Sequence, residues 1–82
     1  MLLKKAIERQ DLQQVARHAL GSKLSADTYQ VDFSNTIVEI VDEFETSGQP
    51  DNAILACRVG LYLYPDHDGL KAVLERLVQV YR

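Results

Sequence analysis

The sequence predicts an all-α fold: a compact bundle of five to six short helices in a single domain of residues 1–82. Apolar side chains recur every three to four residues over most of the chain, as on one face of a helix. The two prolines and four glycines fall where these periodic segments begin or end. The one stretch that alternates like a strand, residues 29–33, has no second strand to pair with.

Composition and length are those of a folded globular domain. Of the 82 residues, 46% are hydrophobic and 26% are charged, which is ordinary for such domains. No apolar stretch approaches the roughly 20 residues that span a bilayer, and the N-terminus lacks the pattern of a signal peptide. The single cysteine, Cys57, cannot form an intramolecular disulfide. We therefore expect a cytoplasmic protein with no membrane partner.

The first two helices are predicted from spacing and capping residues. The first covers about residues 2–9. Asp11 precedes the second helix and Gln14 follows three residues later, the pattern of a helix cap. We expect this helix over residues 12–20, ending where Gly21 can adopt a left-handed conformation. The expected core residues are Leu3, Ala6 and Ile7 from the first helix and Leu12, Val15, Ala16 and Ala19 from the second.

The middle of the chain is the least regular part. Residues 22–33 follow neither a helical nor a strand period, so we expect a loop, with at most one helical turn, whose apolar side chains contact the core. Ser34 is expected to cap a helix over residues 35–46, which should end at Gly48. The apolar stripe expected on this helix consists of Ile37, Val38, Ile40, Val41 and Phe44.

Two further helices complete the prediction. Pro50 suits the first turn of a helix, and residues 51–64 carry only Arg58 as a charged side chain after that turn. A helix that is apolar nearly all round is predicted to be the central one. The last helix, over residues 70–81, has the clearest stripe, formed by Leu70, Val73, Leu74, Leu77, Val78 and Tyr81.

The segment YPDHDG, residues 64–69, surrounds a histidine with carboxylates. Pro65 must end the preceding helix, and we expect Asp66 or Asp68 to cap the last one. For a metal site, adjacent side chains diverge, and the only other histidine lies far away in the second helix. We therefore expect a helix junction at His67, with no metal and no cofactor.

No arrangement typical of an enzyme is found. Cys57 lies among apolar residues of a predicted helix, which indicates a buried thiol with a raised pKa. Tyr62, Tyr64 and Tyr81 are expected at the edge of the core, because lysine and arginine do not alternate with them as in base-stacking surfaces. We expect a protein that is not an enzyme and has no small-molecule substrate.

Charge is distributed unevenly along the chain. The net charge is −3, which argues against nucleic acid as a partner. Residues 1–25 carry five basic and two acidic side chains, whereas residues 26–51 carry seven acidic ones and no lysine or arginine. A solvated acidic face is one interpretation. The other is that this face docks onto the basic face of a second copy, giving head-to-tail association. The candidate interaction residues are Lys4, Lys5, Arg9, Arg17, Glu39, Asp42, Glu43 and Glu45.

The order of these motifs resembles the effector-associated domain family, type 1, of bacterial conflict systems. The resemblance covers nearly the whole chain. It is carried by Leu3 and Ile7, DLQQVARHALGSKL (11–24), IVEIVDEF (37–44) closed by Gly48, and the stretch from Ile54 through YPDHDGL (64–70). That last segment is similar to the family's Pro-x-Asn-x-x-Leu ending, with His67 in place of asparagine.

The resemblance implies a death-fold-like bundle and a non-enzymatic adaptor that binds like domains. In such systems the adaptor brings together effectors such as proteases or nucleotide-hydrolysing switches. An alternative is a fragment of a tetratricopeptide-like scaffold that binds a peptide or helix, because residues 53–77 resemble one helical hairpin of such a repeat. Against it, the chain holds no second copy at the repeat's spacing.

Overall fold

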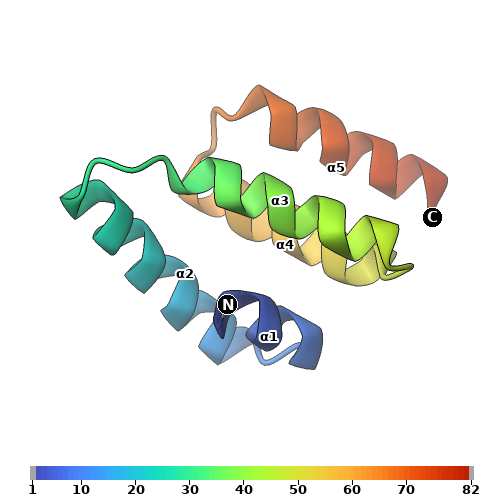
Figure 1. Ribbon diagram of the computed structural model, residues 1–82. Coiled ribbons are helices and arrows are strands. Elements are labelled where there is room, and N and C mark those ends of the chain that lie inside the picture. Colours follow the sequence, from blue (N-terminus) through green and yellow to red (C-terminus); the bar gives the residue numbers. More distant parts are fainter. Residues whose placement is uncertain (1, 82) are drawn as a thin grey trace.

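Five α-helices make up nearly all of the chain and confirm the all-α prediction. The computed structural model describes residues 2–81, and this range contains no strand. Figure 1 shows α1 and α2 together on one side of α3 and α4, with α5 along the other side. The Cα radius of gyration, 11.9 Å, is close to the value of about 11.7 Å for a compact chain of this length. The helices are α1 (Leu2–Arg9), α2 (Leu12–Thr28), α3 (Phe33–Thr46), α4 (Pro50–Leu63) and α5 (Asp68–Val80).

Helix α4 lies at the centre of the bundle, as predicted. It contacts all four other helices, and Pro50 stands in its first turn. Its buried side is formed mainly by small residues, Ala53, Ala56 and Gly60, which let neighbouring helices approach closely. The largest fully buried side chains come from the other helices and from Cys57; they are Leu3, Ile7, Ile37, Phe44, Leu70 and Leu77.

The predicted start of α2 is confirmed. The Asp11 carboxylate accepts a hydrogen bond from the Gln14 backbone N–H at 3.3 Å, which satisfies one of the free amides of the first turn. Helix α1, which precedes this cap, spans the predicted residues. Its buried side chains are the three expected ones, Leu3, Ala6 and Ile7.

Helix α2 is longer than predicted. It continues through Gly21 to Thr28, so the expected helix end at Gly21 and the expected loop over residues 22–33 are both wrong. A glycine inside a helix costs only about 1 kcal/mol. The residues that follow it support the helix, because Lys23 Nζ lies 2.8 Å from a carboxylate oxygen of Asp27, one turn further on.

Only one side of α2 contacts the core. Val15 and Ala19 are buried as predicted, but Leu12 is 65% exposed and Ala16 is exposed as well. Four large apolar residues between Gly21 and the start of α3 were expected to contact the core. Only Phe33, the first residue of α3, is buried there. The others, Leu24, Tyr29 and Val31, are exposed.

A residue in the left-handed region follows three of the helices. These residues are Gln10, Gln30 and Gly48, with φ of 55°, 57° and 74°. After α2, the N–H groups of Gln30 and Val31 donate to carbonyls of the last turn, the paired bonds of a Schellman motif. The predicted end of α3 at Gly48 is confirmed. Glutamine rarely adopts this conformation, so the sequence carries no signal for the true end of α2.

Asp32 caps α3, and the prediction of Ser34 as the cap is wrong. The helix begins at Phe33, and Asp32 Oδ1 accepts hydrogen bonds from the Ser34 N–H at 2.9 Å and from the Ser34 hydroxyl at 2.5 Å. Ser34 is buried within the first turn. It therefore donates to the capping side chain and does not cap the helix itself.

The hydroxyl of Ser34 is expected to control the pKa of Asp32. Its hydrogen bond, followed by that of the Ser34 N–H, holds the pKa of Asp32 below the ordinary value of 3.8. The cap thus contributes stability above the unfolded-state pKa and loses it as the pH falls through the lower, folded-state pKa. We expect Ser34→Ala to move the pKa of Asp32 back toward 3.8 in an NMR titration of carboxyl carbons. Thr36→Ala should leave it in place, and a wild-type pKa at or above 3.8 would contradict this account.

His67 caps α5. Its Nδ1 accepts a hydrogen bond from the Leu70 backbone N–H at 3.1 Å, so the prediction that Asp66 or Asp68 makes this contact is wrong. Asp68 is the first residue of α5, and Asp66 is exposed. The segment YPDHDG is a helix junction, as predicted. A neutral imidazole nitrogen takes the part expected of a carboxylate, because it too has a lone pair to offer the free amide.

The apolar stripes of α3 and α5 face the core over most of their length. The exceptions lie at the edges, where Val38 is 38% exposed and Tyr81, just after α5, is 46% exposed. The buried members are Ile37, Ile40, Val41 and Phe44 in α3 and Leu70 and Leu77 in α5, with Val73 and Leu74 packed partly against them.

Candidate functional site

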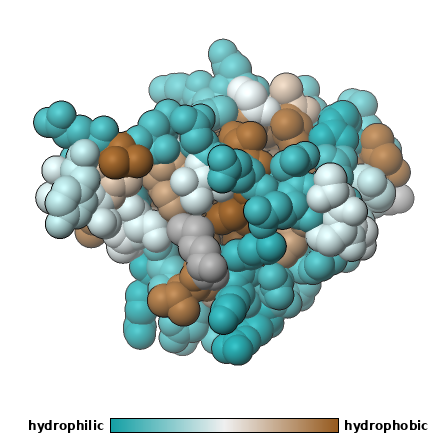
Figure 2. Space-filling model, in the orientation of Figure 1, coloured by the Kyte–Doolittle hydropathy of each residue, from teal (hydrophilic) through white to brown (hydrophobic). Residues whose placement is uncertain are grey.

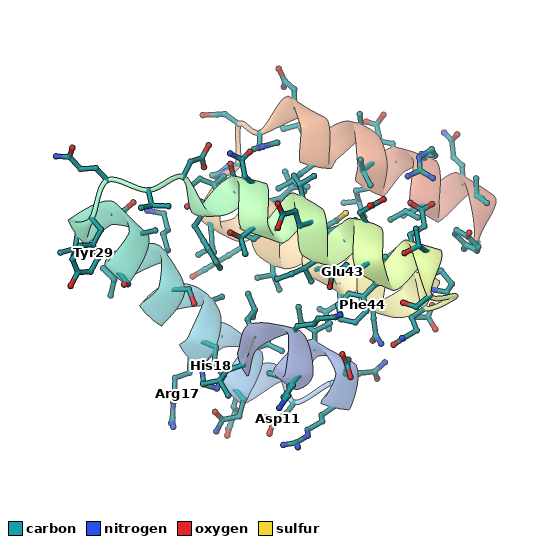
Figure 3. All side chains as sticks on the ribbon, in the orientation of Figure 1. Asp11, Arg17, His18, Tyr29, Glu43 and Phe44 are labelled. Carbon is teal, nitrogen blue, oxygen red and sulfur yellow. The ribbon has the colours of Figure 1, made fainter. Side chains whose placement is uncertain are left out.

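Lys4 and Glu43, predicted to meet between copies, form an ion pair within one chain. Lys4 Nζ lies 2.7 Å from Glu43 Oε2 and stands over the Phe44 ring, 5.6 Å from its centroid. The hydrogen bond to Glu43 raises the pKa of Lys4. In Figure 3, Glu43 lies on the side of α3 that faces α1. The two side chains therefore partly neutralise each other within one chain.

Glu45 is also paired within the chain. The Arg76 guanidinium of α5 donates through both terminal nitrogens, at 2.5 and 2.8 Å, to the two carboxylate oxygens of Glu45. This hydrogen bonding holds the pKa of Glu45 below its ordinary value. Such two-pronged pairing fixes orientation as well as charge. Glu45 therefore ties the end of α3 to α5, and it is not free for the interaction predicted from the sequence.

Three of the predicted basic residues are without an ion-pair partner among residues 2–81. They are Lys5, Arg9 and Arg17, here called the basic face. Lys5 and Arg9 line a hollow between α1 and α2, and Arg17 lies beside the next hollow along α2, with His18 shared by both. Asp11 lines the first hollow too, but its carboxylate caps α2. Figure 3 shows Arg17 pointing away from α3, α4 and α5.

Two of the predicted acidic residues are likewise unpaired within the described range. They are Glu39 and Asp42, here called the acidic face, and both are exposed. They line a hollow of about 210 Å³ between α3 and α5, with Val38, Val73 and Arg76 among its other walls. Because α3 and α4 separate α5 from α1 and α2 in Figure 1, the acidic and basic faces point to different sides of the bundle.

An apolar groove that was not predicted from the sequence lies between α2 and α4. Leu12 and Ala16 were expected to be buried against the core, but they form one wall of this groove. On the other wall, Tyr62 is 75% exposed. A signal was present in the i, i+4, i+8 spacing of Leu12, Ala16 and Leu20. The groove has a volume of about 290 Å³ and is lined by Leu12, Val15, Ala16, Ala19, Leu20, Leu55, Arg58, Val59 and Tyr62.

Cys57 and Tyr64, which carry the other reactive side chains discussed above, belong to the core or pack against it. Cys57 is fully buried, and burial raises the pKa of its thiol to about 11, in line with the prediction. Tyr64 is half-buried, and burial raises its pKa, while Lys23 Nζ stands 5.7 Å from its ring centroid. Within residues 2–81, no group of three or more His, Cys, Asp or Glu side chains is placed to hold a metal ion.

Comparison of the chain with protein-family models, curated proteins and solved structures finds no match. Over residues 2–81, no helix has both the length and the apolar character needed to cross a membrane. Figure 2 shows that the face seen in Figure 1 is mostly hydrophilic, with scattered hydrophobic side chains. The charged faces and the apolar groove are therefore the surface features on which a function can rest.

Proposed function

We propose that this chain is a non-enzymatic adaptor domain that binds like domains and so couples effectors in a bacterial immunity or signalling system. The observation that carries the proposal is the placement of the basic and acidic faces on different sides of the bundle, each without an ion-pair partner among residues 2–81. A surface complementary to a different surface of the same molecule leads to head-to-tail association.

The pattern of ion pairs supports an intermolecular use for these charges. Two ion pairs join different helices of the chain, Lys4 with Glu43 and Arg76 with Glu45. Lys5, Arg9 and Arg17 on α1 and α2 form no ion pair with Glu39 or Asp42 on α3 among residues 2–81. A second copy can supply the missing partners to both sets.

The association should be weak and sensitive to salt. Exposed ion pairs gain little in water, and complementary charges mainly steer the encounter and fix the orientation of partners. At physiological ionic strength the screening length is about 8 Å, so the two faces attract only at close approach. Such reversible contacts suit an adaptor. The resemblance to effector-associated domains and the all-helical bundle support the same function.

Charge reversal on each face tests the proposal. We expect Glu39→Lys/Asp42→Lys and Lys5→Glu/Arg9→Glu each to stop head-to-tail growth beyond two copies, because each variant carries two faces of like charge. An equimolar mixture should assemble again, because the variants are then complementary. Sedimentation velocity at about 0.05 M salt, where the screening length exceeds about 10 Å, measures this directly.

Matched controls separate the two faces from net charge. Asp66→Lys and Lys71→Glu change the net charge in the same senses, by half as much, at exposed residues outside both faces, and each should assemble like the wild type. Growth beyond two copies that persists in both double variants, or a mixture of the variants that does not grow beyond two copies, would overturn head-to-tail docking through these residues.

The alternative function, a tetratricopeptide-like scaffold fragment, receives less support. Helices α4 and α5 do form a hairpin with Pro65 between them. However, the hairpin shares one hydrophobic core with α1, α2 and α3, through Ile7, Val15 and Phe44 among others. A repeat hairpin depends on neighbouring repeats to cover its apolar face, whereas this one is covered within the chain.

A further inference from the structure

The outward side of α4 carries a single row of four side chains, of which two are charged and two are large and hydrophobic. Asp51, Leu55, Arg58 and Tyr62 follow one another at spacings of four, three and four residues, the spacing of a helix–helix seam. Asp51, Arg58 and Tyr62 are exposed and Leu55 is half-buried. Small residues such as Gly60 take the opposite, buried side, where α3 and α5 pack. No helix of the described chain covers the outward seam.

The two charges of this seam match a second copy of the same helix. Asp51 and Arg58 lie about two turns apart on one face, and neither has an ion-pair partner among residues 2–81. When two such helices pair antiparallel about a two-fold axis beside Leu55, Asp51 of each copy faces Arg58 of the other. The two leucines then meet at the axis. The complementarity is reciprocal, as an isologous interface requires.

The apolar groove extends this seam. Leu12 and Leu20 of α2 flank Leu55, Val59 and Tyr62 of α4, and the two leucines are 65% and 45% exposed. Contiguous exposed apolar side chains of this kind mark interaction sites. In a two-fold pair the α2 helices of the two copies lie across the axis from each other and toward the same end of it, so both flank the paired α4 helices.

We propose that the outward face of α4, with the groove beside it, is a two-fold dimer interface whose partner is a second copy of this chain. This inference rests on the proposed function and adds a second contact between copies. Its apolar centre and reciprocal ion pairs distinguish it from head-to-tail docking. Together the two contacts let dimers join into larger assemblies.

The test uses the Glu39→Lys/Asp42→Lys variant as background, because it removes head-to-tail docking. We expect this background to dimerise in sedimentation equilibrium over about 10 μM to 1 mM protein. Adding Asp51→Lys or Arg58→Glu should raise the dimer dissociation constant at least about tenfold, since each change sets like charges opposite each other twice. Tyr62→Ser should weaken the dimer as well.

Mixing the two single reversals decides the geometry. Asp51→Lys in one copy and Arg58→Glu in the other restore both ion pairs, so the mixture should dimerise more tightly than either variant alone. The combined Asp51→Lys/Arg58→Glu chain should also dimerise. Lys71→Glu and Asp66→Lys serve as charge-matched controls that keep the dimer, and circular dichroism confirms that each variant is folded.

Three outcomes would overturn the dimer: a background variant that is monomeric at about 1 mM, a single reversal that dimerises as tightly as the background, or a mixture that dimerises no more tightly than either single reversal. The first outcome, together with salt-sensitive assembly of the wild type, would remove the α4 interface and leave head-to-tail docking intact. If the background variant dimerises but the wild type forms nothing larger than a dimer, head-to-tail docking is removed and the α4 interface is left intact.

Discussion

Replacing Phe44 with alanine is expected to remove a large part of the protein's free energy of unfolding. Phe44 is fully buried in α3, and truncating such a ring costs about 3–5 kcal/mol in lost burial and cavity formation. A chain of 82 residues has about 4–12 kcal/mol of total stability. Urea denaturation followed by circular dichroism measures the loss.

The matched control for Phe44 lies on the same helix. Val38 is 38% exposed at the edge of the apolar stripe, so Val38→Ala should cost less than about 1 kcal/mol. Equal losses for the two variants would mean that Phe44 does not occupy the centre of the core. A loss below about 2 kcal/mol for Phe44→Ala would mean the same.

Gly60→Ala is expected to destabilise the fold by about 1–3 kcal/mol, although alanine favours helices more than glycine does. A Cβ at this position would lie 2.6 Å from Leu70 Cδ1 and 2.8 Å from Ile37 Cγ2. Ile37 Cγ2 is branched directly from its Cβ, so it can give way only if the backbone of α3 shifts. Thermal and urea unfolding of the variant measure the cost.

Gly21→Ala is the control for Gly60→Ala, and it also tests the length of α2. Nothing lies within 4 Å of a Cβ added at Gly21, which is inside the helix. We expect Gly21→Ala to stabilise the protein by about 0.5–1 kcal/mol. A destabilising effect would instead indicate the left-handed helix end that the sequence suggested. A neutral Gly60→Ala would contradict the close packing of α3 and α5 on α4.

The fold could be predicted in its elements, but the ends of the elements were less certain. Apolar periodicity identified the central α4 and the stripes of α3 and α5, because burial of one face is a repeated signal. Helix ends depend on single residues. Gly48 was predictable since glycine prefers positive φ, whereas Gln30 carries no such preference and Gly21 does not use it. The start of α5 also depends on a single residue, because His67 makes the capping contact that was expected of a carboxylate.

The candidate site was predicted as a set of charges, and only the structure shows which of them pair. Lys4 and Glu43 are 39 residues apart in the chain, so their contact depends on how α1 packs against the rest. The same holds for Arg76 and Glu45. The apolar groove escaped prediction because periodicity shows that a side of α2 is apolar but does not show whether another helix covers it.

The central claim is that copies of this chain recognise each other through oppositely charged faces, and sedimentation velocity of the wild-type chain tests it most directly. At about 0.05 M salt we expect the average mass to grow with protein concentration beyond that of two copies. At about 1 M salt, where the screening length is about 3 Å, the mass should fall back to that of a dimer or less. A mass that does not change with salt, or a single copy at every concentration, would contradict the claim.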